Sequence, residues 1–262
     1  MINSIAGHYT NTLRLVITSA TNLKAELDWL IQNKIDKDGW NLVTIYGTSP
    51  LSKTAFAAFA LECYLNKIRL AVAFTAMSEV DASLSYNNKQ TDSRKKLVAC
   101  VTEYEDYTTS NGGGDPVYYK NLLLQSSAKL KANGMLLGVY QGWSKSYEAI
   151  VAAADFMVMT YYRTSAQMAT PKDYWEYMKA RYTEYAAAAK KIGKVFPIIP
   201  MISTEPGFGQ DYMKTHTWDQ VKADYKAKWD ANATLDMKQY LIVNQLYVFV
   251  TSHSKVSKPL TA

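Results

Sequence analysis

Short apolar runs alternate with longer helical segments along the whole chain. Most of these runs are continuously apolar rather than strictly alternating, which is typical of parallel strands that are covered on both faces. Eight strands are expected, at Leu13–Thr18, Leu42–Tyr46, Leu70–Thr75, Leu97–Glu103, Leu136–Tyr140, Phe156–Tyr161, Val195–Ile202 and Leu241–Val250.

The segments between these strands carry helix start and stop signals. Ser49, Asp115 and Thr170 each precede a proline, which favours the first helical position. Gly134 and Gly193 are typical helix stops. The signals predict helices over Asn22–Lys34, Ser49–Asn66, Asp115–Asn133, Ser144–Ala153 and Thr170–Gly193, and a further helix that opens with a capping box from Thr217 to Gln220.

Alternation of strand and helix throughout one chain predicts right-handed crossovers and a parallel sheet. Eight repeats in 262 residues favour a closed (β/α)8 TIM barrel, for which ~250 residues is typical, over an open sheet. The polar segment Met77–Lys95 predicts little helix, and only about a dozen residues follow Val250, so the last helix is expected to be short or missing. We expect residues 1–262 to form a single barrel domain.

Composition narrows the class of protein further. The net charge of +6 comes from scattered basic residues, so we do not expect a nucleic-acid partner. No apolar stretch reaches the ~18 residues of a membrane span, and the polar start from Met1 to Thr10 is not a signal peptide. Export with a signal removed before Met1 is one alternative for the natural compartment. The 20 tyrosines against 7 phenylalanines suit a wet groove that binds sugars or peptides, and we expect a monomer.

Cofactor chemistry is not indicated. Cys63 and Cys100 are expected to be buried free thiols, and His8, His216 and His253 are far apart in the sequence, so neither residue type predicts a metal site. Walker, dinucleotide-binding, nucleophile-elbow and zinc-protease motifs are absent from the sequence. We therefore expect no cofactor.

The best candidates for chemistry are Glu103 and Glu105 at the end of the fourth expected strand. Active sites of TIM barrels lie at the carboxyl ends of the strands. Strand side chains alternate, so the two glutamates share a face roughly 7 Å apart along the strand. Repulsion between neighbouring carboxylates favours one protonated carboxyl, the form that a general acid needs. The alternatives are a solvated acidic loop or a pair neutralised by Arg163.

Other strand ends offer side chains that suit a sugar. Tyr161 can steady a developing charge, and Gln141 can orient a hydroxyl. Trp143 can stack on a sugar ring or pack onto the following helix. Tyr46, Arg163 and Glu205 are further candidates for substrate binding, each at or just after the end of an expected strand.

Two glycine-containing loops follow these strands. Gly112–Gly114 comes directly after the glutamate pair and is either a lid or a plain connector. Pro206–Gly209 follows the seventh strand, where TIM barrels often bind phosphate.

Two segments resemble the family 18 glycoside hydrolases, the chitinase and endo-β-N-acetylglucosaminidase barrels. The segment Asp155–Tyr161 is similar to that family's Met-Thr-Tyr-Asp signature on strand six, and Val98–Glu105 aligns with its D-G-x-D-x-D-x-E motif on strand four. The resemblance implies that Glu105 protonates the glycosidic oxygen, Glu103 orients an acetamide, and Tyr161 contacts that acetamide. Val98, Ala99 and Val101 depart from the motif's Asp, Gly and Asp, and Tyr162 from its final Asp.

Three functions remain open at this point. The leading hypothesis is a glycoside hydrolase that acts on a glycan, one containing N-acetylhexosamine being a specific case. The second is a non-catalytic glycan-binding barrel descended from such enzymes, which the missing aspartates of strand four favour. The third is an enzyme for a phosphorylated or anionic metabolite, based on the net charge and the Pro206–Gly209 loop.

Overall fold

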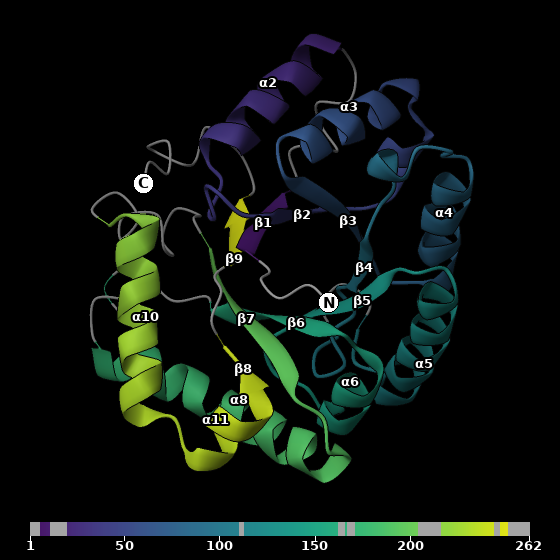
Figure 1. Cartoon of the computed structure of the whole chain (residues 1–262). Coiled ribbons are helices and arrows are strands. Elements are labelled where there is room, and N and C mark those ends of the chain that lie inside the picture. Colours follow the sequence, from purple (N-terminus) through teal and green to yellow (C-terminus); the bar gives the residue numbers. More distant parts are fainter. Residues whose placement is uncertain are drawn as a thin grey trace.

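The computed structural model describes residues 6–10, 20–109, 113–161, 166, 171–203, 216–243 and 247–250. Parallel strands form a ring at its centre, and helices surround the ring (Figure 1). The strands are β1 (Ala6–Thr10), β2 (Asn41–Ile45), β3 (Ile68–Phe74), β4 (Ala99–Thr102), β5 (Leu136–Gln141), β6 (Phe156–Tyr161), β7 (Phe196–Ser203), β8 (Leu241–Ile242) and β9 (Tyr247–Val250).

Pairing of the strands closes the ring. Each strand from β1 to β7 pairs in parallel with the next, β7 also pairs with β9, and β9 pairs with β1. The short strand β8 pairs only with the start of β7. The expected (β/α)8 TIM barrel is therefore confirmed. The expected short or missing last helix falls on residues 251–262, outside the described residues.

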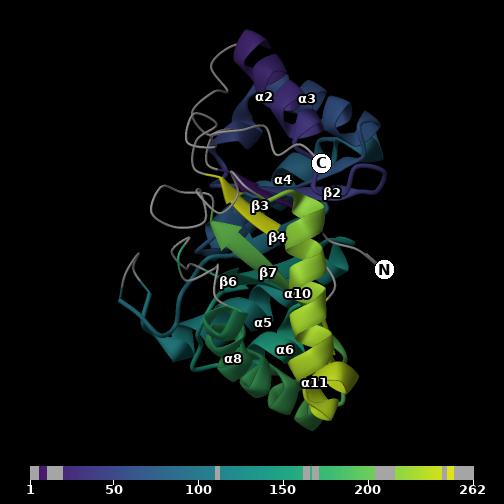
Figure 2. The same cartoon turned by 90° about the vertical axis from the view of Figure 1, so that its left-hand side faces the viewer.

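The helices stand beside the strands on the outside of the barrel (Figure 2). Two of the expected caps are confirmed. Asp115 accepts hydrogen bonds from the backbone N–H groups of Val117 and Tyr118, and Thr217 forms the capping box with Gln220. The helices are α2 (Ala20–Gln32), α3 (Thr54–Leu65), α4 (Met77–Asn88), α5 (Pro116–Ala132), α6 (Tyr147–Ala153), α8 (Pro171–Ile192), α10 (Trp218–Asn232) and α11 (Leu235–Tyr240), with 3-10 turns η1 (Ser49–Ser52) and η2 (Ser93–Lys95).

The first and last strands differ from the prediction. The first strand is Ala6–Thr10, a segment that the sequence pattern does not mark, and the expected Leu13–Thr18 lies outside the described residues. Ala6–Thr10 forms a strand because it pairs with β2 on one side and with β9 on the other, and not because its sequence is an apolar run. The predicted continuous last strand is divided into β8 and β9.

The two parts of the last strand pair with different parts of β7. Pro197 is opposite Ile242 in β8, and Met201 is opposite Tyr247 in β9. Residues 244–246 between them lie outside the described ranges.

Helix α4 corrects the expectation of little helix after the third strand. The carboxylate of Glu79 accepts hydrogen bonds from the backbone N–H groups of Thr75 at 2.7 Å and Ala76 at 3.2 Å, which satisfies the helix start. Val80 and Leu84 are buried against the barrel. Burial of one face against the barrel thus stabilises a helix that the polar composition of this segment does not predict.

Two other helix starts also differ from the prediction. Helix α2 begins at Ala20 rather than at Asn22, and α6 begins after Ser146 rather than Ser144. The Ser144 hydroxyl is used elsewhere, because it donates to Asp106 and accepts from the backbone N–H of Ser146.

The core has two parts, which the strand alternation separates. Inside the barrel lies a small cluster that includes Ala71, Ala99, Val101, Tyr140 and Val158. A larger cluster fills the space between the strands and the helices. Cys63 of α3 and Cys100 of β4 belong to this outer cluster and are free, as expected.

Candidate functional site

The candidate site lies at the barrel mouth, which we define as the end where the carboxyl ends of the strands meet. Side chains alternate between the two faces of a strand, so every second residue points into the barrel. Extending this pattern from the interior cluster to the ends of β2, β4 and β6 places Tyr46, Glu103 and Thr160 on the interior side. Glu103 extends the ladder of β4, because its backbone N–H donates to the carbonyl of Phe74 at 2.9 Å. Tyr46 and Glu103 are half-buried, so two predicted residues face the interior of the mouth.

Further polar side chains at the mouth were not predicted as site residues. Tyr140 and Thr160 are each 9% exposed, and Ser203 at the end of β7 is 1% exposed. Each of these three residues follows an interior residue of its strand by two positions, so the alternation of side chains between the two faces could have identified them. The sequence alone does not say which face is the interior one, because both faces of a barrel strand are apolar.

Glu105 lies in the loop after β4 and is half-buried. Its Oε1 accepts a hydrogen bond from the hydroxyl of Tyr107 at 3.0 Å. Burial raises the pKa of that Tyr107 hydroxyl, and the neighbouring Glu105 carboxylate raises it further. The hydroxyl therefore stays protonated and remains a donor to Glu105 over the physiological range.

The loop backbone around Glu105 is tightly packed. The backbone N–H of Gly114 donates to the Glu105 carbonyl at 2.8 Å. A Cβ atom at Gly113 would lie 2.2 Å from the Glu105 carbonyl oxygen and 2.6 Å from that of Thr108. Only glycine fits at position 113, so the end of the glycine loop is fixed against Glu105. Residues 110–112 of the same loop are outside the described ranges.

Asp106, which the sequence analysis passed over, is the centre of a buried hydrogen-bond network. It is 0% exposed, and its carboxylate accepts from the side-chain amide of Gln141 at 2.5 Å and from the Ser144 hydroxyl at 3.0 Å. The backbone N–H of Lys145 donates a third hydrogen bond at 3.0 Å. Asp106 thus joins the loop after β4 to the loop after β5.

Gln141 takes part in this network rather than lining the interior of the barrel. It shares its face of β5 with Leu137 and Val139, which belong to the outer cluster between strands and helices. The side chain is fully buried, and its Nε2 donates to Asp106. Its predicted contact with a substrate hydroxyl would require a different orientation.

Trp143 lies in the loop after β5 and is 41% exposed. The guanidinium of Arg181 from α8 packs against its ring at 4.9 Å and against the ring of Tyr177 at 4.1 Å. Arg181 itself is only 2% exposed. The sequence singled out Arg163 as the cation that could neutralise the glutamates, but Arg163 lies outside the described residues.

Three predicted site residues have no described side chain. The backbone of Tyr161 pairs with Ile202 at the end of β7, and Arg163 and Glu205 fall in ranges that are not described. The loop Pro206–Gly209 also falls outside them. Their predicted roles in substrate binding stay predictions.

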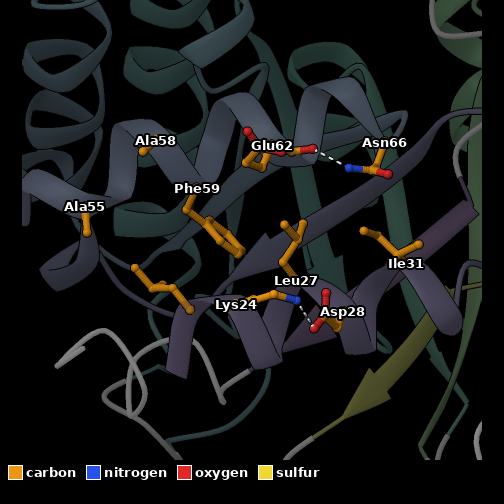
Figure 3. A pocket seen from close by; sticks show the side chains of 10 residues that line it. Lys24, Leu27, Asp28, Ile31, Ala55, Ala58, Phe59, Glu62 and Asn66 are labelled. Atoms are coloured by element: carbon orange, nitrogen blue, oxygen red, sulfur yellow. Dashed lines mark hydrogen bonds and ion pairs between the residues drawn. The ribbon is translucent and has the colours of Figure 1, made fainter. Parts of the chain in front are cut away.

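Two cavities in the described part of the chain lie away from the mouth. One, of about 500 Å³, is a groove between α2 and α3 that is lined mainly by apolar side chains such as Leu27, Ile31 and Phe59 (Figure 3). Another, of about 420 Å³, lies between α5, α6 and α8. Neither is lined by the glutamates, so these cavities do not mark the candidate site.

The described ranges show neither a metal site nor a membrane-spanning helix. Within them no group of three or more His, Cys, Asp or Glu side chains is arranged to hold a metal ion. None of the helices described is both long and apolar enough to cross a membrane.

Comparison with known proteins gives no match to a family model and none to a curated protein sequence. Solved structures do match. An active-site mutant of the Rhizomucor miehei β-1,3-glucanosyltransferase, in complex with laminaritriose, has a TM-score of 0.57 and 15% identity, covering 99% of this chain and 96% of that chain. The structure described as the glycoside hydrolase family 17 β-1,3-glucanosyltransferase from Rhizomucor miehei gives 0.59 and 14%, covering 93% and 85%.

A chitinase from Chromobacterium violaceum has a TM-score of 0.43 and 14% identity, and covers 76% of this chain and 68% of that chain. The likeness to the two glucanosyltransferase structures, at 14–15% identity, shows the fold alone. The chain is therefore a TIM barrel similar to those of glycoside hydrolases. The more specific likeness to family 18 stays a prediction.

Proposed function

We propose that this protein is a glycoside hydrolase that acts on a glycan, with Glu105 as the general acid. The observation that carries the proposal is the position of Glu105 in the loop at the barrel mouth, where it is half-buried and where the Tyr107 hydroxyl, donating to Oε1 at 3.0 Å, fixes the orientation of the carboxyl group. Strand-end carboxylates are the usual source of acid–base chemistry in this fold. The likeness to two structures of a Rhizomucor miehei β-1,3-glucanosyltransferase supports the same class of substrate.

In this mechanism, protonated Glu105 gives its proton to the glycosidic oxygen as the bond to the anomeric carbon breaks. Glu103, on the interior side of β4, stabilises the positive charge that develops on the sugar ring or orients an acetamide group. A water molecule adds to the anomeric carbon, and the proton that it loses restores the starting state. Tyr46, Tyr161 and Trp143 hold the sugar around this centre, with Arg163 and Glu205 as further contacts.

Two substrate classes follow from two different observations. The neighbour solved with laminaritriose supports a β-1,3-linked glucan. The Met159-Thr160-Tyr161 segment supports a glycan that contains N-acetylhexosamine, through its resemblance to family 18. The chemistry assigned to Glu105 is the same for both.

Product analysis on laminari- and chito-oligosaccharides tests the proposal. The wild-type protein should release reducing ends from at least one of them, and Glu105→Gln should bind the same sugar without releasing product. Glu148→Gln on the outer surface of α6 is a matched control, because its exposed carboxylate pairs with Lys191 at 2.7 Å and does not line the mouth. Normal turnover by Glu105→Gln would reject the assignment.

The second candidate is a barrel that binds glycans without cleaving them. Val98, Ala99 and Val101 in place of a chitinase-like Asp-Gly-x-Asp favour it. It predicts binding with no release of reducing ends from any sugar in the panel. Turnover of a single substrate by the wild-type protein would exclude it.

A further inference from the structure

The exposed indole of Trp143 is backed by a buried cation. Its ring is 41% exposed, and the Arg181 guanidinium lies 4.9 Å from the ring centroid. An exposed aromatic ring presents a flat apolar surface on which the C–H face of a pyranose ring can stack. Such a platform works only if its orientation is fixed in advance, because ordering a free side chain costs binding energy.

The Arg181 guanidinium is held in place by hydrogen bonds at its edge and by an aromatic ring on one of its faces. One terminal nitrogen donates to the carbonyl of Thr160 at 2.5 Å, and the other donates to the Tyr177 hydroxyl at 2.5 Å. The Tyr177 ring also stacks on the guanidinium at 4.1 Å. Burying a guanidinium is costly unless it is hydrogen-bonded. In the described part of the chain it has no ion pair, so these contacts define its plane.

The backbone next to Trp143 also rests on Arg181. A Cβ atom at Gly142 would lie 3.2 Å from the Cζ atom of Arg181 and 2.5 Å from Oγ1 of Thr160. The loop after β5 therefore approaches the guanidinium as closely as a residue without a side chain allows. Both the ring of Trp143 and the backbone that carries it depend on Arg181.

The same guanidinium lies close to the group that bonds Glu105. Its positive charge opposes the rise in the pKa of Tyr107, and Tyr107 donates to Glu105 at 3.0 Å. The loop that carries Glu105 and the loop that carries Trp143 are also joined directly, because Asp106 accepts a hydrogen bond from the Ser144 hydroxyl at 3.0 Å. A sugar stacked on Trp143 would therefore lie next to the loop of the proposed acid.

We propose that Arg181 is a positioning residue that presents the outer face of Trp143 as a stacking platform for a pyranose ring, forming a sugar subsite next to Glu105. The identity of the ligand as a sugar rests on the function proposed above. The platform itself rests on the stack of Tyr177, Arg181 and Trp143.

The chain contains a matched control for this stack. At the opposite end of the barrel, the Arg69 guanidinium packs against the Trp40 ring at 4.3 Å and against the Tyr64 ring at 4.6 Å, the two ring centroids being 5.1 Å apart, and Trp40 is 38% exposed. Arg69→Lys removes the same planar contact as Arg181→Lys while keeping the charge. Any general effect of losing a tryptophan–guanidinium stack should appear equally in both variants.

The experiment combines a measurement without ligand and one with ligand. In protein labelled with 5-fluorotryptophan, the fluorine resonance of Trp143 is identified by its loss in Trp143→Phe. Arg181→Lys and Arg181→Met should shift or broaden that resonance, and Arg69→Lys should leave it unchanged. Laminaritriose and chitotriose are the binding probes. For the probe that binds wild-type protein, Arg181→Lys should raise the Kd about tenfold. Trp143→Ala should raise the Kd at least as much. The control Arg69→Lys should leave the Kd unchanged.

The outcomes separate this proposal from the proposed function. An unchanged Kd in Trp143→Ala and Arg181→Lys overturns the platform, whatever the turnover. An unmoved Trp143 resonance in both Arg181 variants overturns the positioning role. Failure of wild-type protein to bind either probe at millimolar concentration also overturns the platform. If the Kd rises as expected while Glu105→Gln still turns over substrate, the platform stands and the proposed acid is wrong.

Discussion

The side-chain amide of Gln141 donates a hydrogen bond to the carboxylate of Asp106 at 2.5 Å, across 35 positions of sequence. This contact and those from Ser144 and Lys145 join the loop that carries Glu105 to the loop that carries Trp143. Since the carboxylate is fully buried, these donors replace all the water that would otherwise solvate it.

Asp106→Asn is expected to destabilise the fold by about 2–3 kcal/mol, because an amide cannot accept from all three donors and leaves buried N–H or O–H groups unpaired. Chemical denaturation at neutral pH measures this loss. The control is Asp155→Asn at the other end of β5, where an exposed carboxylate accepts from the backbone N–H of Leu137 at 2.8 Å. Equal losses in the two variants would contradict a special role for the Asp106 network.

Gly113→Ala is expected to displace the Glu105 backbone, since the new Cβ would lie 2.2 Å from the Glu105 carbonyl oxygen. We expect a larger loss of glycan turnover than of thermal stability. Gly134→Ala is the control, because Gly134 has φ of +69° but no atom within 4 Å of the added Cβ, so it reports backbone strain alone. Unchanged turnover in Gly113→Ala would show that the loop does not position Glu105.

Stability should fall steeply in alkali because of buried tyrosines. Burial raises the pKa of Tyr86 from 10.0 to about 12, and burial also raises the pKa values of Tyr119, Tyr182 and Tyr185 well above 10.0. A pKa that is higher in the folded state means that the folded protein holds the phenolic proton more tightly than the unfolded chain does. This contribution is complete below pH 10 and is lost as the pH rises toward 12.

Urea unfolding midpoints between pH 8 and 11.5 measure this dependence. Tyr86→Phe removes one titrating group, so its midpoint should be lower than that of wild type at pH 8 through loss of the hydrogen bond to the Lys95 carbonyl. The midpoint of this variant should then decline less steeply with pH. An equal slope would show that Tyr86 ionises normally in the folded protein.

The two thiols should be inert in the folded protein. Burial raises the pKa of Cys100 to about 12 and that of Cys63 still further, so almost no thiolate forms at pH 8. Ellman's reagent should label neither thiol in native protein and both after unfolding. Rapid labelling of one thiol in native protein would contradict the burial of that cysteine.

Much of the barrel could be predicted from the sequence, because strand and helix alternate with clear apolar runs and proline or glycine signals. Strand β6 begins and ends at the predicted residues. Strand β1 and helix α4 were missed for a physical reason. The first depends on pairing with two distant strands and the second on burial of one face, and neither leaves a periodic pattern in the sequence.

The positions of the candidate residues could be predicted only in part. Glu103, Glu105 and Trp143 lie at or just after strand ends, as expected from the apolar runs that precede them, and their roles stay predictions. Asp106 was passed over because its partner Gln141 lies on another strand, and only the register of β4 against β5 brings the two together. Arg181 lies in the middle of a helix rich in lysine and tyrosine, where nothing local marks it.

The central claim is that Glu105 protonates the leaving oxygen, and dependence on the leaving group tests it most directly. For an oligosaccharide that the wild-type protein cleaves, Glu105→Gln should lower the rate about 10³-fold, within the range that a general acid contributes. For the dinitrophenyl glycoside of the same sugar, whose leaving group needs no proton, the variant should keep most of the wild-type rate. An equal loss on both substrates, or no loss on the oligosaccharide, would contradict the assignment of Glu105 as the acid.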